Sequence, residues 1–123
     1  MDQPLCLIVD DEPALRTYLR ALLQRNGIQS LEAENAVEAL RILHKRGGEI
    51  DLLITDIQMP GDIDGLDLAY SVKDRFSFVP VILISGDAEK APTGFRFVRK
   101  PFSAGAILDA IGKAMIRTKT GAA

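Results

Sequence analysis

The sequence is poor in the residues that most redox, metal and hydrolase sites require. Its 123 residues include one cysteine, one histidine and no tryptophan. Cys6 lies within an apolar run, so we predict a buried, reduced core residue without a function of its own. His44 lies on the polar side of a helical pattern, as solvated surface residues do. A histidine-based metal site and a hydrolase triad are therefore excluded.

Long apolar runs and a strong excess of charge are also missing. The longest apolar runs, such as 52–54 and 79–84, fall far short of the ~18 residues that a membrane span needs. The start MDQPLCLIVDD lacks the basic region of a secretory signal. A net charge of -2, with both signs evenly spread, gives no electrostatic support for direct nucleic-acid binding. We therefore expect a cytoplasmic protein without membrane insertion or nucleic-acid contacts.

Short apolar runs alternate with helical patterns along the chain, which is typical of βα units around a parallel sheet. We predict one α/β domain with a flavodoxin-like, doubly wound sheet of five parallel strands in the order 2-1-3-4-5. The domain is expected to cover residues 1–118, followed by a flexible tail over 119–123. The second and fifth strands are expected at the periphery; the five strands are Leu5–Val9, Gln29–Ala33, Leu52–Thr55, Val81–Ser85 and Phe95–Arg99.

Helical spacing of apolar residues predicts four helices between and after these strands. The first starts near Pro13 and ends at Asn26-Gly27, and the third runs from near Gly65 to a point before Pro80. The second covers Ala36 to about Arg46 and the last follows Ser103; their expected N-caps are Asn35 and Ser103. The apolar contacts of the second and third helices are expected at Val37, Leu40, Leu43, Leu66, Ala69 and Tyr70.

Acidic residues follow two strands that this topology makes neighbours. Asp10, Asp11 and Glu12 come directly after the first strand, and Asp56 follows the third. Ligand crevices of open α/β sheets lie beyond the carboxyl ends of the strands, near the switch in strand order. Clustered carboxylates repel one another unless they are protonated or bind cations, and a hard divalent cation such as Mg²⁺ (or Mn²⁺) suits them. Capping of the first helix is an alternative role for Asp10 and Asp11, but not for Asp56, which precedes a turn.

A hydroxyl and a cation are expected at the same edge of the sheet. Ser85 ends the fourth strand and Lys100 follows the fifth. Taken singly, Ser85 could start a turn with Gly86, and Lys100 could be a solvated surface lysine. Their shared location with the acids favours a common site.

The whole pattern resembles the receiver domains of bacterial two-component response regulators, and the resemblance covers essentially the entire chain. By this resemblance Asp56 is the phosphoacceptor, and Ser85 and Lys100 contact the phosphoryl group. Asp10, Asp11 and Asp56 hold the metal together with the backbone carbonyl of Gln58. The matching parts, in the family's order, are Asp10-Asp11, Asp56 within DIQMPG, Asp64-Gly65, Ser85 and Lys100-Pro101-Phe102.

The resemblance implies a phosphoacceptor switch in a two-component phosphorelay. Asp56 would receive a phosphoryl group from a phosphohistidine on a histidine kinase or phosphotransfer protein, with Mg²⁺, and binding of an unknown downstream protein would change. The chain would be a regulator that catalyses only its own phosphorylation and dephosphorylation, as a stand-alone receiver or as part of a hybrid kinase. Two alternatives are an unphosphorylated pseudo-receiver that binds proteins and a small phosphatase with an aspartate nucleophile. The phosphatase would need a substrate pocket or cap for which the chain has no spare segment.

Four further expectations follow from the resemblance. Phe97, three residues before Lys100, is either a switch aromatic coupled to Ser85 or an ordinary aromatic that covers the sheet. Gln58 and Asp87 are expected to flank the path of a hydrolytic water and to set the phosphoryl lifetime. The Lys100-Pro101 bond is expected to be cis. The fourth helix of the family should be truncated or absent, because residues 86–99 are few and include Pro92 and Gly94.

Overall fold

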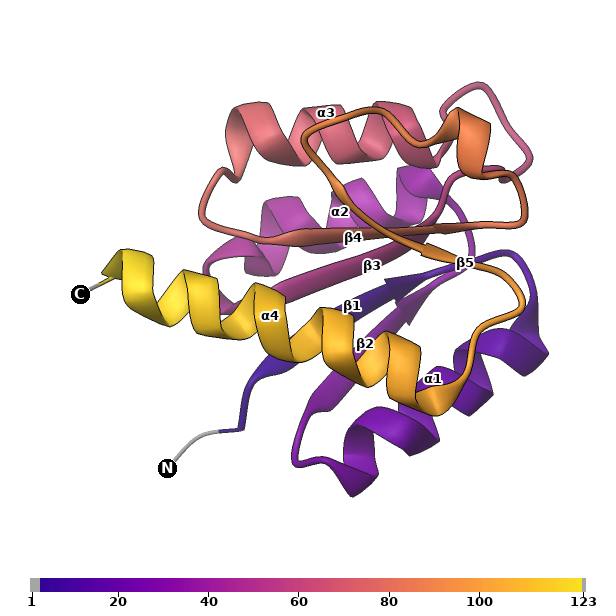
Figure 1. Ribbon diagram of the computed structural model, residues 1–123. Coiled ribbons are helices and arrows are strands. Elements are labelled where there is room, and N and C mark those ends of the chain that lie inside the picture. Colours follow the sequence, from indigo (N-terminus) through magenta and orange to yellow (C-terminus); the bar gives the residue numbers. More distant parts are fainter. Residues whose placement is uncertain (1–2, 123) are drawn as a thin grey trace.

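The computed structural model describes residues 3–122, with side chains up to residue 115. Over this range five strands and four α-helices alternate (Figure 1). Two short 3-10 turns, η1 (Gly47–Glu49) and η2 (Ala88–Lys90), complete the regular structure. The elements are β1 (Leu5–Val9), α1 (Pro13–Arg25), β2 (Gln29–Ala33), α2 (Ala36–Arg46), β3 (Leu52–Asp56), α3 (Gly65–Arg75), β4 (Val81–Ser85), β5 (Arg96–Arg99) and α4 (Ala104–Ala122).

All five strands are parallel and lie in the order β2-β1-β3-β4-β5, as predicted. The strand order reverses at β1, which pairs with both β2 and β3. Helices α1 and α4 cover one face of the sheet, and α2 and α3 cover the other (Figure 1). The carboxyl ends of β1 and β3 therefore lie next to each other at one edge of the sheet.

Burial on both faces explains why the central strands are almost continuously apolar. In β1, Cys6 and Ile8 pack toward α1 and α4, whereas Leu7 and Val9 pack toward α2 and α3. The thiol of Cys6 is buried and reduced, and burial raises its pKa well above the ordinary value. The outer strands β2 and β5 are more exposed, in agreement with their predicted peripheral positions.

The predicted boundaries agree closely with the structure. Three strands, β1, β2 and β4, match the prediction residue for residue, whereas β3 extends one residue further, to Asp56, and β5 starts at Arg96. The Asn35 side chain accepts a hydrogen bond from the Glu38 N–H at 2.8 Å, which confirms the predicted cap of α2. At the start of α4 the Ser103 Oγ accepts from the Ala106 N–H at 3.1 Å.

The predicted loss of the fourth helix is also confirmed. Between β4 and β5 the described structure contains only the single turn η2. The rest of this segment is extended or turned, and Gly94 adopts a positive φ of 96° that favours glycine. In Figure 1 the segment passes close to α3 before it enters β5.

Two side chains predicted to face inward are exposed instead. Val37 of α2 is 46% exposed, and Tyr70 of α3 is 51% exposed. In α2 the small residues Ala36 and Ala39 pack against the sheet, so the buried stripe is rotated away from Val37. Tyr70 packs edge-on against Phe95, with ring centroids 5.2 Å apart. That contact joins residues far apart in the sequence, so helical periodicity does not reveal it.

The C-terminal helix is longer than expected. It continues to Ala122, past residue 118, which is the predicted end of the domain. The division into a domain over 1–118 and a tail over 119–123 stays a prediction, and its last residue lies outside the described range.

Candidate functional site

The predicted acids meet at the carboxyl edge of the sheet. Asp10 follows β1, where its N–H donates to the Ala33 carbonyl at 3.1 Å, and Asp56 is the last residue of β3. Carboxylate oxygens of Asp10, Asp11 and Asp56 all lie within 4.8 Å of one another. Asp10 is 0% exposed and Asp56 is 7% exposed, whereas Asp11 is open to solvent. Such a cluster needs nearby positive charge, because water screens buried carboxylates poorly.

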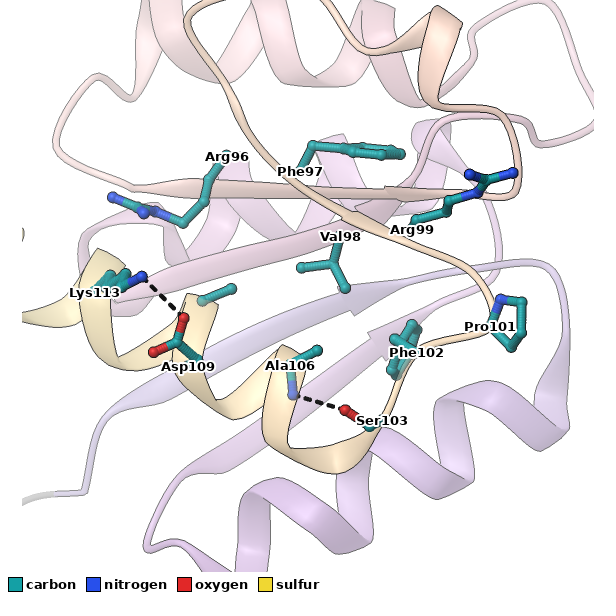
Figure 2. A pocket seen from close by; sticks show the side chains of 11 residues that line it. Arg96, Phe97, Val98, Arg99, Pro101, Phe102, Ser103, Ala106, Asp109 and Lys113 are labelled. Carbon is teal, nitrogen blue, oxygen red and sulfur yellow. Dashed lines mark hydrogen bonds and ion pairs between the residues drawn. The ribbon is translucent and has the colours of Figure 1, made fainter.

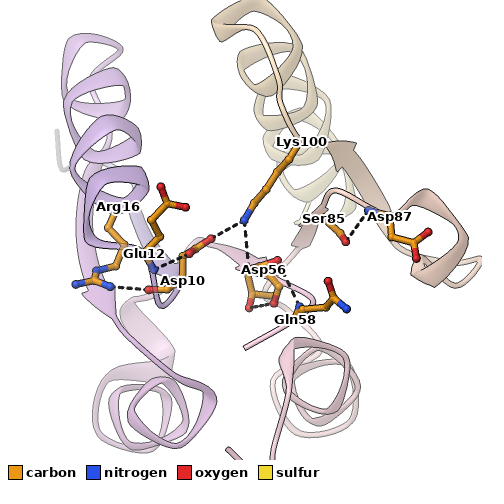
Figure 3. Close-up of polar contacts among 9 residues, drawn as sticks. Asp10, Glu12, Arg16, Asp56, Gln58, Ser85, Asp87 and Lys100 are labelled. Carbon is orange, nitrogen blue, oxygen red and sulfur yellow. Dashed lines mark hydrogen bonds and ion pairs between the residues drawn. The ribbon is translucent and has the colours of Figure 1, made fainter. Parts of the chain in front are cut away.

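Lys100 supplies part of that charge from the end of β5. Its Nζ lies 3.1 Å from Oδ2 of Asp10 and 3.2 Å from Oδ2 of Asp56, so it bridges the two buried acids (Figure 3). The backbone N–H of Lys100 donates to the backbone carbonyl of Ser85 at 2.8 Å, which fixes the chain where it leaves β5. The Lys100-Pro101 bond is cis, as expected. One ammonium against three carboxylates leaves the cluster negative.

The pKa values of Asp56 and Lys100 both lie above their ordinary values, for different reasons. Burial raises the pKa of the Asp56 carboxyl; the Lys100 ammonium opposes this shift and the Asp10 carboxylate adds to it. Burial lowers the pKa of Lys100, but Asp10 and Asp56 outweigh burial and raise it above the ordinary value. Lys100 is therefore held as a cation by the acids that it bridges.

Ser85 and its neighbours form the other side of the site. Ser85 ends β4 and is 1% exposed, and its Oγ accepts the Asp87 N–H at 3.1 Å (Figure 3). The Asp87 side chain accepts the Glu89 N–H at 3.0 Å and so caps η2. Gln58 is exposed beside Asp56, and its N–H donates to Asp56 Oδ1 at 3.3 Å.

Phe97 is half-buried and lies on the α3 side of the sheet. It packs near Ile57, Ala69 and Leu83. Figure 2 shows it on the opposite side of β5 from Val98. This position fits both roles considered for Phe97, so its switch role stays a prediction.

Helix capping does not account for the two acids after β1. Glu12, not Asp10 or Asp11, occupies the N-cap position of α1, and it makes no side-chain cap. Asp10 Oδ1 instead accepts the Glu12 N–H at 2.8 Å, which shapes the turn before the helix. The second carboxylate oxygen of Asp10 faces Lys100.

Three residues support the site in ways that the sequence did not predict. Arg16 donates to the Asp10 carbonyl at 2.6 Å and to Glu32 of β2 at 3.1 Å, which ties the β1–α1 turn to the sheet. The buried Thr55 hydroxyl donates to the Asp56 carbonyl at 3.0 Å. The sequence signal for Arg16 is its place in the first turn of the helix that follows the acids.

Gly65, the third supporting residue, allows α3 to begin directly against Asp56. Its N–H donates to the Ile57 carbonyl at 2.9 Å. A Cβ at this position would lie 1.7 Å from the Asp56 carbonyl oxygen, a distance at which no side chain fits. This close approach explains the glycine of the Asp64-Gly65 pair, whereas Asp64 is the N-cap of α3.

A separate hollow of about 580 Å³ lies between β5 and α4 (Figure 2). Arg96, Arg99 and Lys113 are among its lining residues, and Lys113 pairs with Asp109 at 3.0 Å. None of the clustered acids lines this hollow. The acid cluster is therefore the candidate site, and the hollow is not part of it.

Comparison with known proteins identifies the family. The family model of the response regulator receiver domain matches residues 6–112. The chain is 36% identical over 104 residues to the sensor kinase CckA of Brucella abortus, and the match covers 79% of this chain and 11% of the kinase. It is 35% identical over 117 residues to the chemotaxis protein CheY of Pseudomonas aeruginosa, covering 87% of this chain and 92% of CheY.

A solved structure supports the same assignment. The receiver domain protein from Clostridium thermocellum superposes with a TM-score of 0.87 at 31% identity, covering 95% of this chain and 98% of that one. The chain belongs to the response regulator receiver domain family. Members of this family are phosphoacceptor switches of two-component systems that interact with histidine kinases or phosphotransfer proteins and in general bind Mg²⁺. They are signalling regulators and not classical enzymes.

Some of these relatives are much longer than this chain. The chain spans 11% of the sensor kinase CckA and 23% of an NtrX-like regulator of Rickettsia felis. Among the described residues, none of the helices combines the length and the apolar composition that crossing a bilayer requires.

Proposed function

We propose that Asp56 accepts a phosphoryl group from a phosphohistidine on a histidine kinase or phosphotransfer protein, and that the phosphorylated state alters the binding of a downstream protein. The observation that carries this proposal is the bridge from Lys100 Nζ to both Asp10 and Asp56, at 3.1 and 3.2 Å. This bridge supports the proposal because it joins the Asp56 carboxylate, the Lys100 ammonium and the Asp10 carboxylate at one edge of the sheet. A cytoplasmic location is part of the same proposal.

The transfer conserves atoms and electrons with the residues present. A carboxylate oxygen of Asp56 bonds to phosphorus while the P–N bond of the donor breaks, and the electron pair of that bond returns to the imidazole nitrogen. The protein mainly positions the reactants and offsets negative charge. Lys100 would pair with a phosphoryl oxygen, and its ion pair with Asp56 supports this role. Because Ser85 Oγ accepts the Asp87 N–H, its own hydrogen is available to the phosphoryl group.

The acids also fit a divalent cation. Asp10, Asp11 and Asp56 offer hard oxygen ligands within 4.8 Å of one another, and the Gln58 carbonyl follows Asp56 closely in the chain. Mg²⁺ prefers such oxygen ligands, with open positions left for water or phosphate. When bound, the ion would offset the charge of the carboxylates and of the phosphoryl oxygens.

Finer roles are proposed for residues around Asp56. Gln58 and Asp87 would set the phosphoryl lifetime from either side of the site, and Phe97 would report the position of Ser85. Replacing Phe97 by Trp tests the last role. Unaltered partner binding with and without phosphate in that variant would remove the switch function from Phe97.

Incubation with acetyl phosphate and Mg²⁺ followed by intact-protein mass spectrometry tests the central proposal. We expect a gain of one phosphoryl group in the wild type and in Asp74→Asn, a matched control on the outer side of α3, and none in Asp56→Asn. Removal of the metal with EDTA should abolish the gain. An unmodified wild-type protein that still binds a partner would instead identify a pseudo-receiver.

A further inference from the structure

An apolar groove runs beside α2, separate from the acid cluster. Its volume is about 410 Å³. Five of its lining residues belong to α2, and the sixth comes from the loop that precedes α3. The lining residues are Val37, Leu40, Arg41, His44, Lys45 and Ile63.

The floor of the groove is formed by aliphatic side chains that the core leaves partly uncovered. Val37 is 46% exposed, although the opposite stripe of α2 is packed against the sheet. Leu40 and Ile63 are half-buried and rest on the core cluster beneath α2 and α3. Val37 and Leu40 are three residues apart, so they lie on one face of the helix. Single exposed apolar residues are ordinary, but three that converge in one hollow favour a binding surface.

The rim of the groove is cationic. Arg41 and Lys45 lie one turn apart on α2, a like-charge spacing that destabilises a helix. Neither forms an ion pair within the described part of the chain, whereas the adjacent Arg46 pairs with Glu49 at 2.9 Å. No acidic residue lines the groove. In a chain with a net charge of -2, this is a local reversal of sign. The place of Lys45 in the last turn of α2, where a cation stabilises a helix, explains only part of it, because Arg41 lies further inside the helix.

His44 makes part of the rim rigid. Its Nδ1 lies 2.7 Å from the Leu40 carbonyl, and its ring packs edge-on against Phe76 at 5.8 Å between centroids. A side chain that is already ordered loses little entropy when a partner binds. The groove therefore presents a preformed apolar floor and a border in which His44 is ordered and Arg41 and Lys45 carry the positive charge.

We propose that this groove binds an acidic amphipathic helix of a partner protein. The apolar stripe of that helix would lie on Val37, Leu40 and Ile63, and its Asp or Glu side chains would face Arg41 and Lys45. An extended peptide is a poorer fit, since the groove lies along a helix and offers no strand edge for its backbone hydrogen bonds. A helix satisfies its own backbone groups and can pack against α2 by ridges and grooves.

Charge argues against a second copy of the chain as the occupant. A symmetric dimer uses the same surface on both subunits. Packing α2 against α2 would bring Arg41 and Lys45 toward their own copies. The proposal concerns a surface and does not depend on phosphorylation of Asp56.

Three designed helical peptides can test the proposal by fluorescence anisotropy. The first carries leucines at i, i+3, i+4 and i+7 with glutamates elsewhere; the second has lysines in place of the glutamates; the third has the composition of the first with scrambled leucine positions. We expect the first to bind at least tenfold more tightly than the other two. When this peptide is added, the changes in the protein's backbone amide chemical shifts should be confined to α2 and the loop around Ile63.

Charge-swap variants of the protein give the decisive comparison. Arg41→Glu combined with Lys45→Glu should weaken the glutamate peptide at least tenfold and strengthen the lysine peptide. Arg25→Glu, also in the last turn of a helix, is the matched control and should bind like the wild type. Val37→Ser should weaken binding without reversing the charge preference. Thermal unfolding confirms that each variant is folded.

Several results would overturn the proposal. These are the absence of saturable binding by the glutamate peptide, equal binding by the two charged peptides, or shift changes located on another face. Self-association in sedimentation that the double reversal abolishes would identify a second copy as the occupant, which also contradicts it.

Discussion

The carboxyl edge of the sheet and the neighbouring segment 86–95 are supported in different ways. At the edge, Asp10, Asp56 and Ser85 are almost completely buried and each continues a buried strand. Residues 86–90 of the segment are exposed. The segment is held by one turn, by the contact between Tyr70 and Phe95, and by Lys73, whose Nζ lies 5.2 Å from the Phe95 ring centroid.

This difference shows that the geometry of the acid cluster depends on the sheet and not on a helix between β4 and β5. Four strand ends bring the acids, Ser85 and Lys100 together, and the register of the strands comes from their pairing. The stretch after β4 can shorten to a turn without moving Ser85 or Lys100 out of the site. The surface formed by this segment can therefore vary more freely than the acid cluster.

The largest effect is expected from Gly65→Ala, at the well-supported edge. An added Cβ would meet the Asp56 carbonyl at 1.7 Å, so the start of α3 must move. We expect a loss of about 3 kcal/mol or more in the free energy of unfolding, measured by urea denaturation. Gly112→Ala is the control, because a Cβ there meets nothing within 4 Å. It should stabilise the protein by about 0.5–1 kcal/mol, and equal effects of the two changes would contradict the packing argument.

Lys100→Ala is expected to slow phosphorylation by acetyl phosphate about a hundredfold, or about 2.7 kcal/mol, in the range found when one charge-stabilising group is removed. The reason is that no other cation bridges Asp10 and Asp56 among the described residues. The rate is measured by mass spectrometry at fixed Mg²⁺. Lys90→Ala, in the exposed segment, should leave the rate unchanged. A similar loss of phosphorylation rate in both variants would contradict the conclusion that the sheet edge supports the reaction and the segment 86–95 does not.

A smaller effect is expected from Phe95→Ala. The variant loses the contacts with Tyr70 and Lys73, which we expect to cost about 1.5 kcal/mol in stability because the ring is only half-buried. Urea denaturation measures the loss, and exposed Phe78→Ala should cost less. The phosphorylation rate should stay at the wild-type value. A slower rate would mean that the segment supports the site after all.

The smallest effect is expected from Gln58→Ala. Its side chain is exposed beside Asp56, so its removal should change the phosphoryl lifetime by less than about tenfold, which corresponds to about 1.4 kcal/mol. Decay of the phosphorylated protein after removal of acetyl phosphate gives the lifetime. Gln24→Ala, exposed on α1, is the control. An unaltered lifetime would remove Gln58 from the set of residues that tune the reaction.

Much of the fold follows from local patterns. Apolar runs such as 52–54 identify the buried strands, and Asn35 and Ser103 mark helix starts through short-range hydrogen bonds. Pro92 and Gly94 predict the loss of the fourth helix, because proline restricts the backbone and glycine frees it wherever they occur. The meeting of the acids at the ends of β1 and β3 was also predictable, because the carboxyl ends of neighbouring parallel strands lie at the same edge of a sheet.

Other features needed the packed structure. The exposure of Val37 depends on how closely Ala36 and Ala39 approach the sheet, which helical spacing leaves open. Tyr70 is drawn to Phe95 by a segment far away in the chain. The tie from Arg16 to the Asp10 carbonyl likewise appears only once α1 has packed beside β2.

The sequence alone determined the positions of the five strands and the receiver motif, because apolar runs, turn residues and helix caps act over a few positions. The strand order followed from the connection rules for successive βα units. Only the tertiary structure decided that Lys100 bridges Asp10 and Asp56, that α3 begins against the Asp56 carbonyl, and that an apolar groove with a cationic rim stays open beside α2. Those contacts join residues distant in the chain, and their distances depend on how the helices settle on the sheet.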